Sequence, residues 1–230
     1  MQIRAILTVQ ADEAVRRSIL RFFKEPVDPY GLKTAPSRKL AAQVARDVET
    51  WTEAQRARLC EDLWKSGKLE EGGMACEVYN RTHKSFGESD FRLFEKWIDR
   101  YVHNWAHTDV LCTGMLAAAL SSEPRLIAEL PAWTKSKNRW KRRAAAVSLI
   151  PFAKHGERTA EILALSDLLL GDDDEMVQKG VGWLLKVAYP KRPREVVEFL
   201  SARRAQTTRL VLRYAAEKMT AADRESVLAK

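Results

Sequence analysis

The feature that most restricts the fold of this chain is an internal echo at a shift of 36 residues. The segment KRRAAAVSLIPFAKHG, which begins at Lys141, lies over VQKGVGWLLKVAYPKR, which begins at Val177. A weaker echo, TRLVLRYAAEKM, begins at Thr208. Repeats of this length are typical of antiparallel helix pairs stacked into an α-solenoid, whose concave side forms a long binding groove. We therefore expect an all-α protein in which residues 1–230 form a single α-solenoid domain with a less regular first third.

The composition agrees with a helical chain. Glycine (10) and proline (8) are sparse among the 230 residues, and no alternation of polar and apolar residues lasts long enough to predict a strand. We expect early helices over about residues 12–24, 36–50 and 69–82. The third of these should be interrupted or bent at Gly72-Gly73, because glycine weakens a helix interior.

Positive charge is concentrated in the second half. The chain carries 39 basic and 31 acidic residues, and from Leu130 to Gly156 there are seven bases and no acid. Six of these bases fall between Lys135 and Arg143, and others recur at the starts of later repeats. In a solenoid such positions line one edge, so the bases would form a track suited to a phosphate backbone. The alternative is a solvated helix face that only confers solubility.

Several classes of protein are disfavoured. Three cysteines, Cys60, Cys76 and Cys112, show no CxxC spacing, which favours a reducing compartment and disfavours a zinc site. His103 and His107 stand four apart without a third ligand at useful spacing, so we expect no metal. No run approaches the roughly 18 apolar residues of a membrane span. We expect a soluble, cytoplasmic protein.

The least charged stretch of the chain contains the first candidates for chemistry. Residues 102–122 carry one formal charge, Asp109, four residues after Trp105. On a helix this spacing puts the carboxylate and the indole on the same face. A lone carboxylate in such a stretch is unusual, because charges avoid burial unless they are paired. The alternatives are that Trp105 is a core residue and that Asp109 caps a turn or pairs with a base of the next repeat.

Two further motifs complete a recognisable set. Arg143 stands in WKRRAA and Trp183 in VQKGVGWLLK, after Trp105 and Asp109 in NWAHTD. With these motifs the sequence resembles the AlkD-type DNA alkylation repair glycosylases over nearly the whole chain. The early stretch YGLKTAPSR, which contains Tyr30, and the stretch LWKSGKLEEGGMA also look like the family.

The resemblance implies both fold and activity. It implies HEAT-like helical repeats that form a C-shaped, basic, concave surface gripping duplex DNA. It implies hydrolysis of the N-glycosidic bond of cationic N3- and N7-alkylated purines by a monofunctional enzyme that lacks a deep base-flipping pocket. It implies no metal or organic cofactor, no membrane partner, and a monomer.

The candidate residues suit that chemistry. Asp109 would stabilise positive charge on the deoxyribose and orient a water molecule. The indoles of Trp105 and Trp183 would contact the sugar and attract a cation. Residues expected to bind DNA are Arg143, through a bidentate phosphate contact, with Tyr30, Lys141, Arg142 and Lys179.

Other interpretations stay open at this stage. Trp183 could pack between repeats, and Arg143 could serve as an interhelical ion pair. His107 and Thr108, between Trp105 and Asp109, could change access to the carboxylate. Because fold does not settle activity, the chain could instead be a DNA-binding member without catalysis, or a protein-interaction scaffold.

Overall fold

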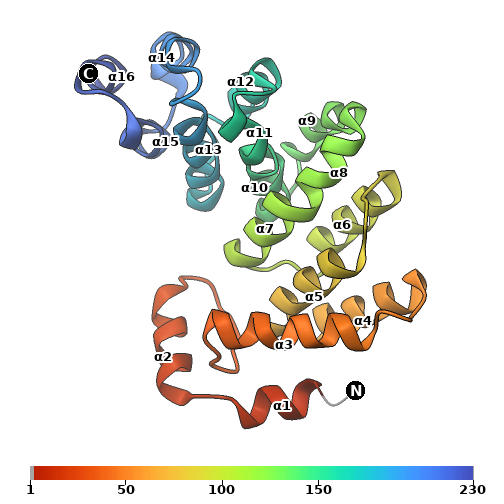
Figure 1. Cartoon of the computed structure of the whole chain (residues 1–230). Helices are drawn as coiled ribbons and strands as arrows, with labels where there is room; N and C mark the ends of the chain where they lie inside the picture. Colours follow the sequence, from red (N-terminus) through yellow and green to blue (C-terminus); the bar gives the residue numbers. More distant parts are fainter. Residues whose placement is uncertain (1–2, 230) are drawn as a thin grey trace.

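The computed structural model describes residues 3–229, and within that range the chain is helical. The described residues contain no strand, and the nearest approach to one is an isolated bridge between Asp28 and Lys68. The helices follow an arc, with the first helices at one end and the C-terminus at the other (Figure 1). The expected all-α class is confirmed. Within residues 3–229, no helix combines the length and the apolar character that crossing a bilayer would require.

The first half of the arc contains six helices in the described residues. They are α1 (Ile3–Val9), α2 (Glu13–Phe22), α3 (Thr34–Asp47), α4 (Glu53–Lys65), α5 (Leu69–Thr82) and α6 (Glu88–Arg100). The expected helix over residues 12–24 is α2, which begins after Asp12 because that carboxylate accepts the backbone N–H groups of Ala14 and Val15. Helix α1 was not expected from the sequence.

The second half begins with a composite helix. It consists of α7 (Trp105–Leu111), a π-helical segment (Cys112–Leu116) and α8 (Ala117–Ser122). The helices that follow are α9 (Leu130–Trp133), α10 (Arg139–Val147), α11 (Ile150–His155), α12 (Thr159–Asp167), α13 (Glu175–Ala188), α14 (Pro193–Ala202), α15 (Arg209–Ala215) and α16 (Ala221–Leu228).

One row of helices lies along the inner side of the arc. Helices α3, α5, α7, α10, α13 and α15 contact one another in that order, and α4, α6, α8, α12, α14 and α16 lie behind them (Figure 1). The echo in the sequence marks two members of this row, because α10 and α13 begin 36 residues apart, at Arg139 and Glu175, and pack directly against each other. The sequence period therefore identified neighbouring helices of the row.

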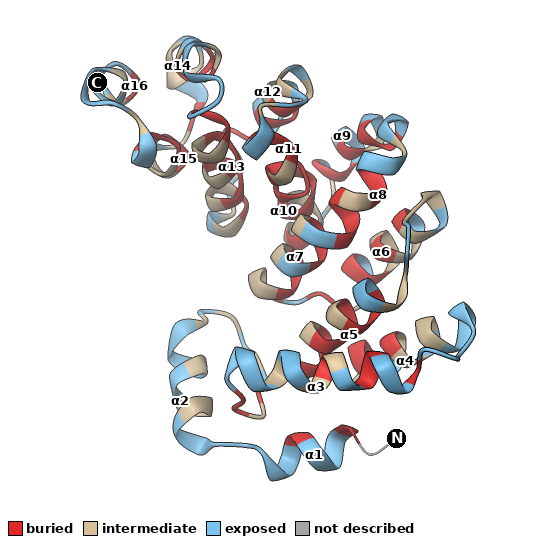
Figure 2. Cartoon of the chain, viewed as in Figure 1, coloured by how far each residue is buried: buried red, intermediate tan, exposed pale blue. Residues whose placement is uncertain are grey.

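Buried residues lie between packed helices, and α2 is the exception. Figure 2 shows buried residues concentrated where helices meet. Phe91, Phe94 and Trp97 are fully enclosed on α6, and burying one such ring contributes about 1.5–3 kcal/mol. Helix α2, in contrast, contains no buried residue although its apolar side chains share one face. It lies at the end of the arc, beside the inner row (Figure 2).

The predicted bend at Gly72-Gly73 is wrong, since α5 runs unbroken from Leu69 to Thr82. The reason is a close approach between helices. A Cβ atom at Gly72 would lie 2.5 Å from Cε1 of His107 on α7. At Gly73 a Cβ atom would meet nothing within 4 Å. Gly72 therefore allows α5 and α7 to pack closely, and it does not break the helix.

Candidate functional site

A cavity of about 460 Å³ is lined by residues of four helices of the inner row and by the end of α2. Its walls come from the end of α2 and the residues after it, and from α7, α10, α13 and α15. The lining residues are Phe22, Lys24, Glu25, Trp105, Asp109, Arg143, Met176, Lys179, Trp183, Lys186 and Tyr214. The structure thus brings five of the sequence-predicted residues together: Trp105, Asp109, Arg143, Lys179 and Trp183.

Helix α7 places the first two of these residues. The side chain of Asn104 accepts the backbone N–H of His107 at 2.9 Å, and this N-cap starts the helix at Trp105. Asp109 follows one turn later on the same face. The π-helical segment begins at Cys112, and the hydroxyl of Thr113 donates to the carbonyl of Asp109 at 2.7 Å. Such π-helical segments are frequent at functional sites.

The carboxylate of Asp109 forms a bidentate ion pair with Arg143. The Nε and Nη2 atoms of Arg143 donate to Oδ1 and Oδ2 of Asp109 at 2.9 and 2.8 Å. The side chain of Arg143 is 6% exposed and that of Asp109 is 16% exposed. Burial raises the pKa of Asp109 above its usual value, while the hydrogen bonds from Arg143 oppose the rise. The pair fixes the orientation of the carboxylate at the cavity wall.

Two glycines of α13 make room for the site. A Cβ atom at Gly180 would lie 3.2 Å from Cγ of Arg143, so the missing side chain allows the arginine to lie against α13. A Cβ atom at Gly182 would lie 2.4 Å from Cβ of Tyr214, which allows α15 to pack closely. Trp183, next to Gly182, is half-buried: it packs against the core and also lines the cavity. Trp183 therefore packs between helices, as one interpretation of the sequence expected, and also keeps part of its ring accessible from the cavity, as the other expected.

Trp105 is half-buried as well, and two phenylalanines contact it. The ring of Phe23 stacks on the indole, with centroids 5.0 Å apart and planes inclined by 17°. The ring of Phe22 meets the indole edge-on, at 5.6 Å and 69°. One face of Trp105 is therefore covered by Phe23, and the remaining surface of the indole contributes to the cavity.

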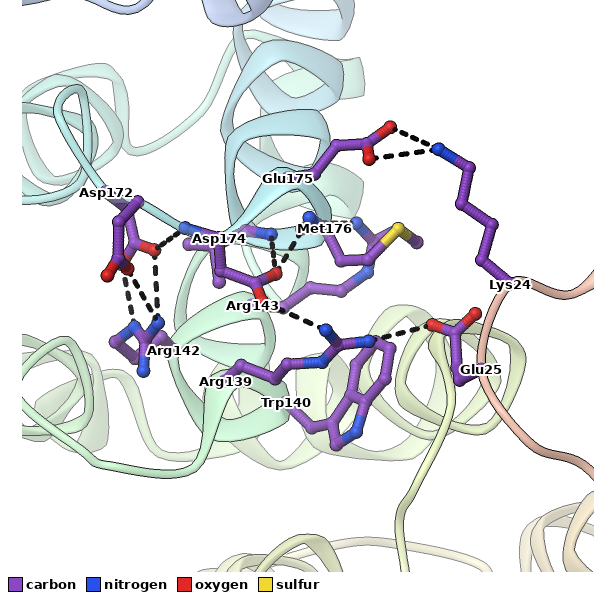
Figure 3. A network of polar contacts seen from close by, with 12 residues as sticks. Lys24, Glu25, Arg139, Trp140, Arg142, Arg143, Asp172, Asp174, Glu175 and Met176 are labelled. Carbon is purple, nitrogen blue, oxygen red and sulfur yellow. Dashed lines mark hydrogen bonds and ion pairs between the residues drawn. The ribbon is translucent and has the colours of Figure 1, made fainter.

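The residues after α2 cross from the N-terminal half of the arc to α10 and α13 (Figure 3). Lys24 Nζ lies 3.0 Å from Oε2 of Glu175. Glu25 Oε1 accepts from Nη2 of Arg139 at 3.1 Å, and Nη1 of Arg139 donates to Asp174 at 3.0 Å. We call Phe23, Lys24 and Glu25 the strap. The sequence reasoning missed its role, for which the only signal was an aromatic pair followed by charges before Pro26.

Two basic residues expected to bind DNA lie outside the cavity. Lys141 Nζ contacts Glu95 at 3.0 Å and Asp99 at 2.7 Å, both on α6. Arg142 makes a bidentate contact with Asp172, with the Nε atom at 2.7 Å from Oδ2. Neither residue is among those that line the cavity around Asp109. Lys186, one of the later bases of the predicted track, does line it, although it was not among the residues expected to bind DNA.

Tyr30 also lies outside the cavity. Its hydroxyl donates to Oε1 of Glu71 at 2.7 Å, and its backbone N–H donates to Glu70 at 2.8 Å. Burial, with the hydrogen bond to Glu71, raises the pKa of Tyr30 to about 12. In this structure the tyrosine therefore serves the packing of the loop before α3.

His107 faces away from the cavity. Its Nε2–H donates to the carbonyl of Leu69 at 2.8 Å, and its Nδ1 accepts from the amide of Asn104 at 3.0 Å. Burial lowers the pKa of His107 to about 4, so the ring is neutral at pH 7. Among residues 3–229, no group of three or more His, Cys, Asp or Glu side chains is placed to hold a metal ion.

Comparison with known proteins identifies the family to which this chain belongs. The family described as DNA alkylation repair enzyme matches residues 3–219 of this chain, so the protein belongs to that family. A solved structure described as a predicted DNA alkylation repair enzyme from Enterococcus faecalis superimposes with a TM-score of 0.81 at 14% sequence identity, covering 92% of this chain and 98% of that one. At this identity the likeness concerns the fold. No curated protein matches the sequence.

Proposed function

We propose that the protein is a monofunctional DNA glycosylase that hydrolyses the N-glycosidic bond of cationic N3- and N7-alkylated purines in duplex DNA, without a deep base-flipping pocket. The observation that carries this proposal is Asp109: a carboxylate held by Arg143 lines one cavity together with the indoles of Trp105 and Trp183. Membership of a DNA alkylation repair family supports the choice of substrate class.

The alkylated base is a good leaving group and needs no protonation by the enzyme. Alkylation leaves a positive charge on the purine, so the bond electrons return to the ring and the base departs neutral. Positive charge then develops at C1′ of the deoxyribose. Asp109 attracts that charge and orients a water molecule, whose oxygen bonds to C1′ while its proton passes to the carboxylate or to solvent. No metal or organic cofactor takes part.

Arg143 positions the acid and has donors to spare. A guanidinium carries five N–H groups. Two of them bind Asp109, and one on Nη1 donates to the carbonyl of Met176. The remaining N–H groups can bind a phosphate oxygen of the target nucleotide, as proposed from the sequence.

The other cavity residues suit the DNA strand. The faces of Trp105 and Trp183 left open to the cavity attract a developing cation. Lys24, Lys179 and Lys186 line the same cavity, where they share the carboxylates of Glu175 and Glu217. The positive charge that these two acids leave unbalanced can attract phosphates. We propose duplex DNA as the partner, bound by a monomer in which residues 1–230 form a single α-solenoid domain with a basic concave groove. DNA contacts are still predicted for Lys141, Arg142 and Tyr30. Because these residues do not line the cavity, such contacts would lie outside it.

The test is release of free base from a duplex that carries N7-methylguanine. We expect Asp109→Asn to reduce single-turnover excision by about 10²–10³-fold, the effect of losing one electrostatic stabiliser, with DNA affinity largely retained. Asp99→Asn is the matched control, because Asp99 also pairs with a basic side chain, that of Lys141, but lies outside the cavity. Equal excision by wild type and Asp109→Asn would refute the catalytic assignment.

A second candidate follows from the ion pair itself. An acid with a purely structural role can also form an ion pair with a guanidinium. The contact between Asp109 and Arg143 therefore also fits a DNA-binding protein without catalysis. No base release by wild type, with affinity for duplex DNA that falls by orders of magnitude as salt rises, would favour this candidate. Weak, salt-insensitive binding would instead indicate a protein-interaction scaffold.

A further inference from the structure

The end of α2 carries an aromatic ring that the fold leaves uncovered. Phe22 is 71% exposed, yet it borders the cavity that contains Asp109 and touches the edge of Trp105. It also borders a second, more apolar cavity of about 590 Å³ between α2, α3, α5 and α7. Phe22 and Trp105 are common to both cavities. An apolar ring at such a junction has surface available for a ligand.

The strap fixes the position of this ring. Phe23 stacks on Trp105, Lys24 pairs with Glu175, and Glu25 pairs with Arg139. The three residues that follow Phe22 are thus each held by a contact, while Phe22 itself presents its ring to solvent. A ring held in this way loses little conformational freedom when it binds, which favours affinity.

The surroundings of the ring indicate the kind of ligand. Lys24, Lys179 and Lys186 line the cavity beside it. Lys24 and Lys179 both contact Glu175 and Lys186 contacts Glu217, so three lysines share two carboxylates and leave a net positive charge next to a flat apolar surface. Aromatic rings flanked by basic side chains are the arrangement with which proteins hold unstacked nucleobases, because every base offers a flat face and a nearby phosphate. A protein surface that bound only apolar side chains would gain nothing from the lysines.

We propose that Phe22 stacks on an unpaired base of the target base pair when DNA is bound at the cavity that contains Asp109. Trp105, Asp109 and Trp183 would then act at the sugar, while Phe22 contacts the base. Because damaged or mismatched pairs open at a lower free-energy cost, this contact would favour damaged sites over intact duplex. The inference rests on the proposed DNA-binding function and assigns a residue that recognises the damaged pair.

The test compares two duplexes of one sequence, intact or with a tetrahydrofuran residue that leaves one base unpaired. Wild type should prefer the tetrahydrofuran duplex. Phe22→Ala should reduce the preference for that duplex over the intact duplex by about tenfold, the effect of losing one stacked base. Phe22→Trp should retain the preference. Leu20→Ala is the matched control, because Leu20 is an exposed apolar residue of α2 that lines neither cavity.

The outcomes separate this inference from the catalytic proposal. An unchanged ratio of the two affinities in Phe22→Ala, or no preference by wild type, overturns the role of Phe22, whatever the excision assay gives. A lost preference in Phe22→Ala supports it even if wild type releases no base, in which case only the catalytic proposal fails. Thermal unfolding of each variant shows whether it is folded, and the Phe22→Trp variant shows whether an aromatic ring is what matters.

Discussion

Glu71 and Asp109, in two regions of the molecule, are each held beside an arginine, and of these two acids only Asp109 lines the cavity of the candidate site. On α5 the side chain of Glu71 is fully enclosed, and its oxygens accept two contacts from Nε and one from Nη2 of Arg4, with a fourth from Tyr30. Asp109 is 16% exposed and accepts one bond from Arg143 on each oxygen. Burial and a guanidinium partner are common to both, so they do not mark a chemical site. What distinguishes Asp109 is access from the cavity.

The neighbour of Glu71 shows what the first region does. Glu70 accepts the backbone N–H groups of Tyr30, Gly31 and Leu32, at 2.8 to 2.9 Å. These bonds hold the loop that connects the strap to α3. Glu70 therefore positions backbone and Glu71 binds two side chains, whereas the carboxylate of Asp109 lines the cavity.

The largest expected contrast is in the pH dependence of excision. On the proposed mechanism the reaction needs ionised Asp109, and burial raises the pKa of this group, as a nearby DNA polyanion would do further. Single-turnover excision by wild type should fall about tenfold for each pH unit below that pKa, with an acid limb at higher pH than an ordinary carboxyl gives. The residual rate of Asp109→Asn should lack this limb. A wild-type excision rate that does not change as the pH falls would contradict a role for Asp109 in the reaction.

The next contrast is in stability. Glu71→Gln weakens the hydrogen bonds that a buried carboxylate accepts from Arg4 and Tyr30, while Arg4 is exposed enough to be rehydrated, so the free energy of unfolding should fall by about 1.5–3 kcal/mol. Excision per folded molecule should stay at the wild-type level, because Glu71 does not line the cavity around Asp109. Chemical denaturation and active-site-normalised kinetics measure the two effects. A selective loss of kcat in this variant would contradict the division between the two regions.

His107 lies where the two regions meet, and its titration offers a third comparison. The pKa of this residue is lowered to about 4 in the folded protein by burial. Its contribution to stability is therefore complete above the unfolded pKa of about 6.5 and is lost as pH falls toward the folded value, by about 3 kcal/mol in all. Asp109 acts in the opposite sense, since its folded pKa is raised. Unfolding of His107→Gln between about pH 7 and pH 4 should show a shallower pH dependence than wild type.

The smallest expected effect concerns the contact between α5 and α7. Gly72→Ala places a methyl group 2.5 Å from the ring of His107, so it should destabilise the protein by about 1–3 kcal/mol. Gly73→Ala is the matched control on the same helix, where nothing lies within 4 Å. It should stabilise the protein by about 0.5–1 kcal/mol, since alanine favours a helix. Equal thermal shifts for both variants would show that the close approach is unimportant.

Local signals in the sequence predicted much of the inner row. The echo identified α10 and α13, and the spacing of Trp105 and Asp109 placed both side chains at one cavity. The role of Gly72 was predicted wrongly, because a glycine that allows close packing and one that bends a helix look alike until the neighbouring helix is known. Composition alone could not have predicted which glycine faces His107.

The partners of charged residues were the hardest to foresee. Lys141 and Arg142 are bound by carboxylates of α6 and of the residues before α13, and these acids lie about 30 to 46 positions away in the sequence. A run of bases in the sequence does not show how many of them neighbouring helices neutralise. For the same reason the part played by Lys24 and Glu25 could not be read from the residues around them.

The strap has a consequence for how the chain reaches its native state. Lys24 and Glu175 are separated by 151 positions, and Glu25 and Arg139 by 114, whereas the other side-chain hydrogen bonds of the described residues span at most 67. Helices of the arc can associate with their neighbours in turn, because those contacts close short loops. The two long-range ion pairs can form only after both ends are in place. They should therefore be among the last contacts to appear during refolding, and moderate salt should loosen them while the helices stay assembled.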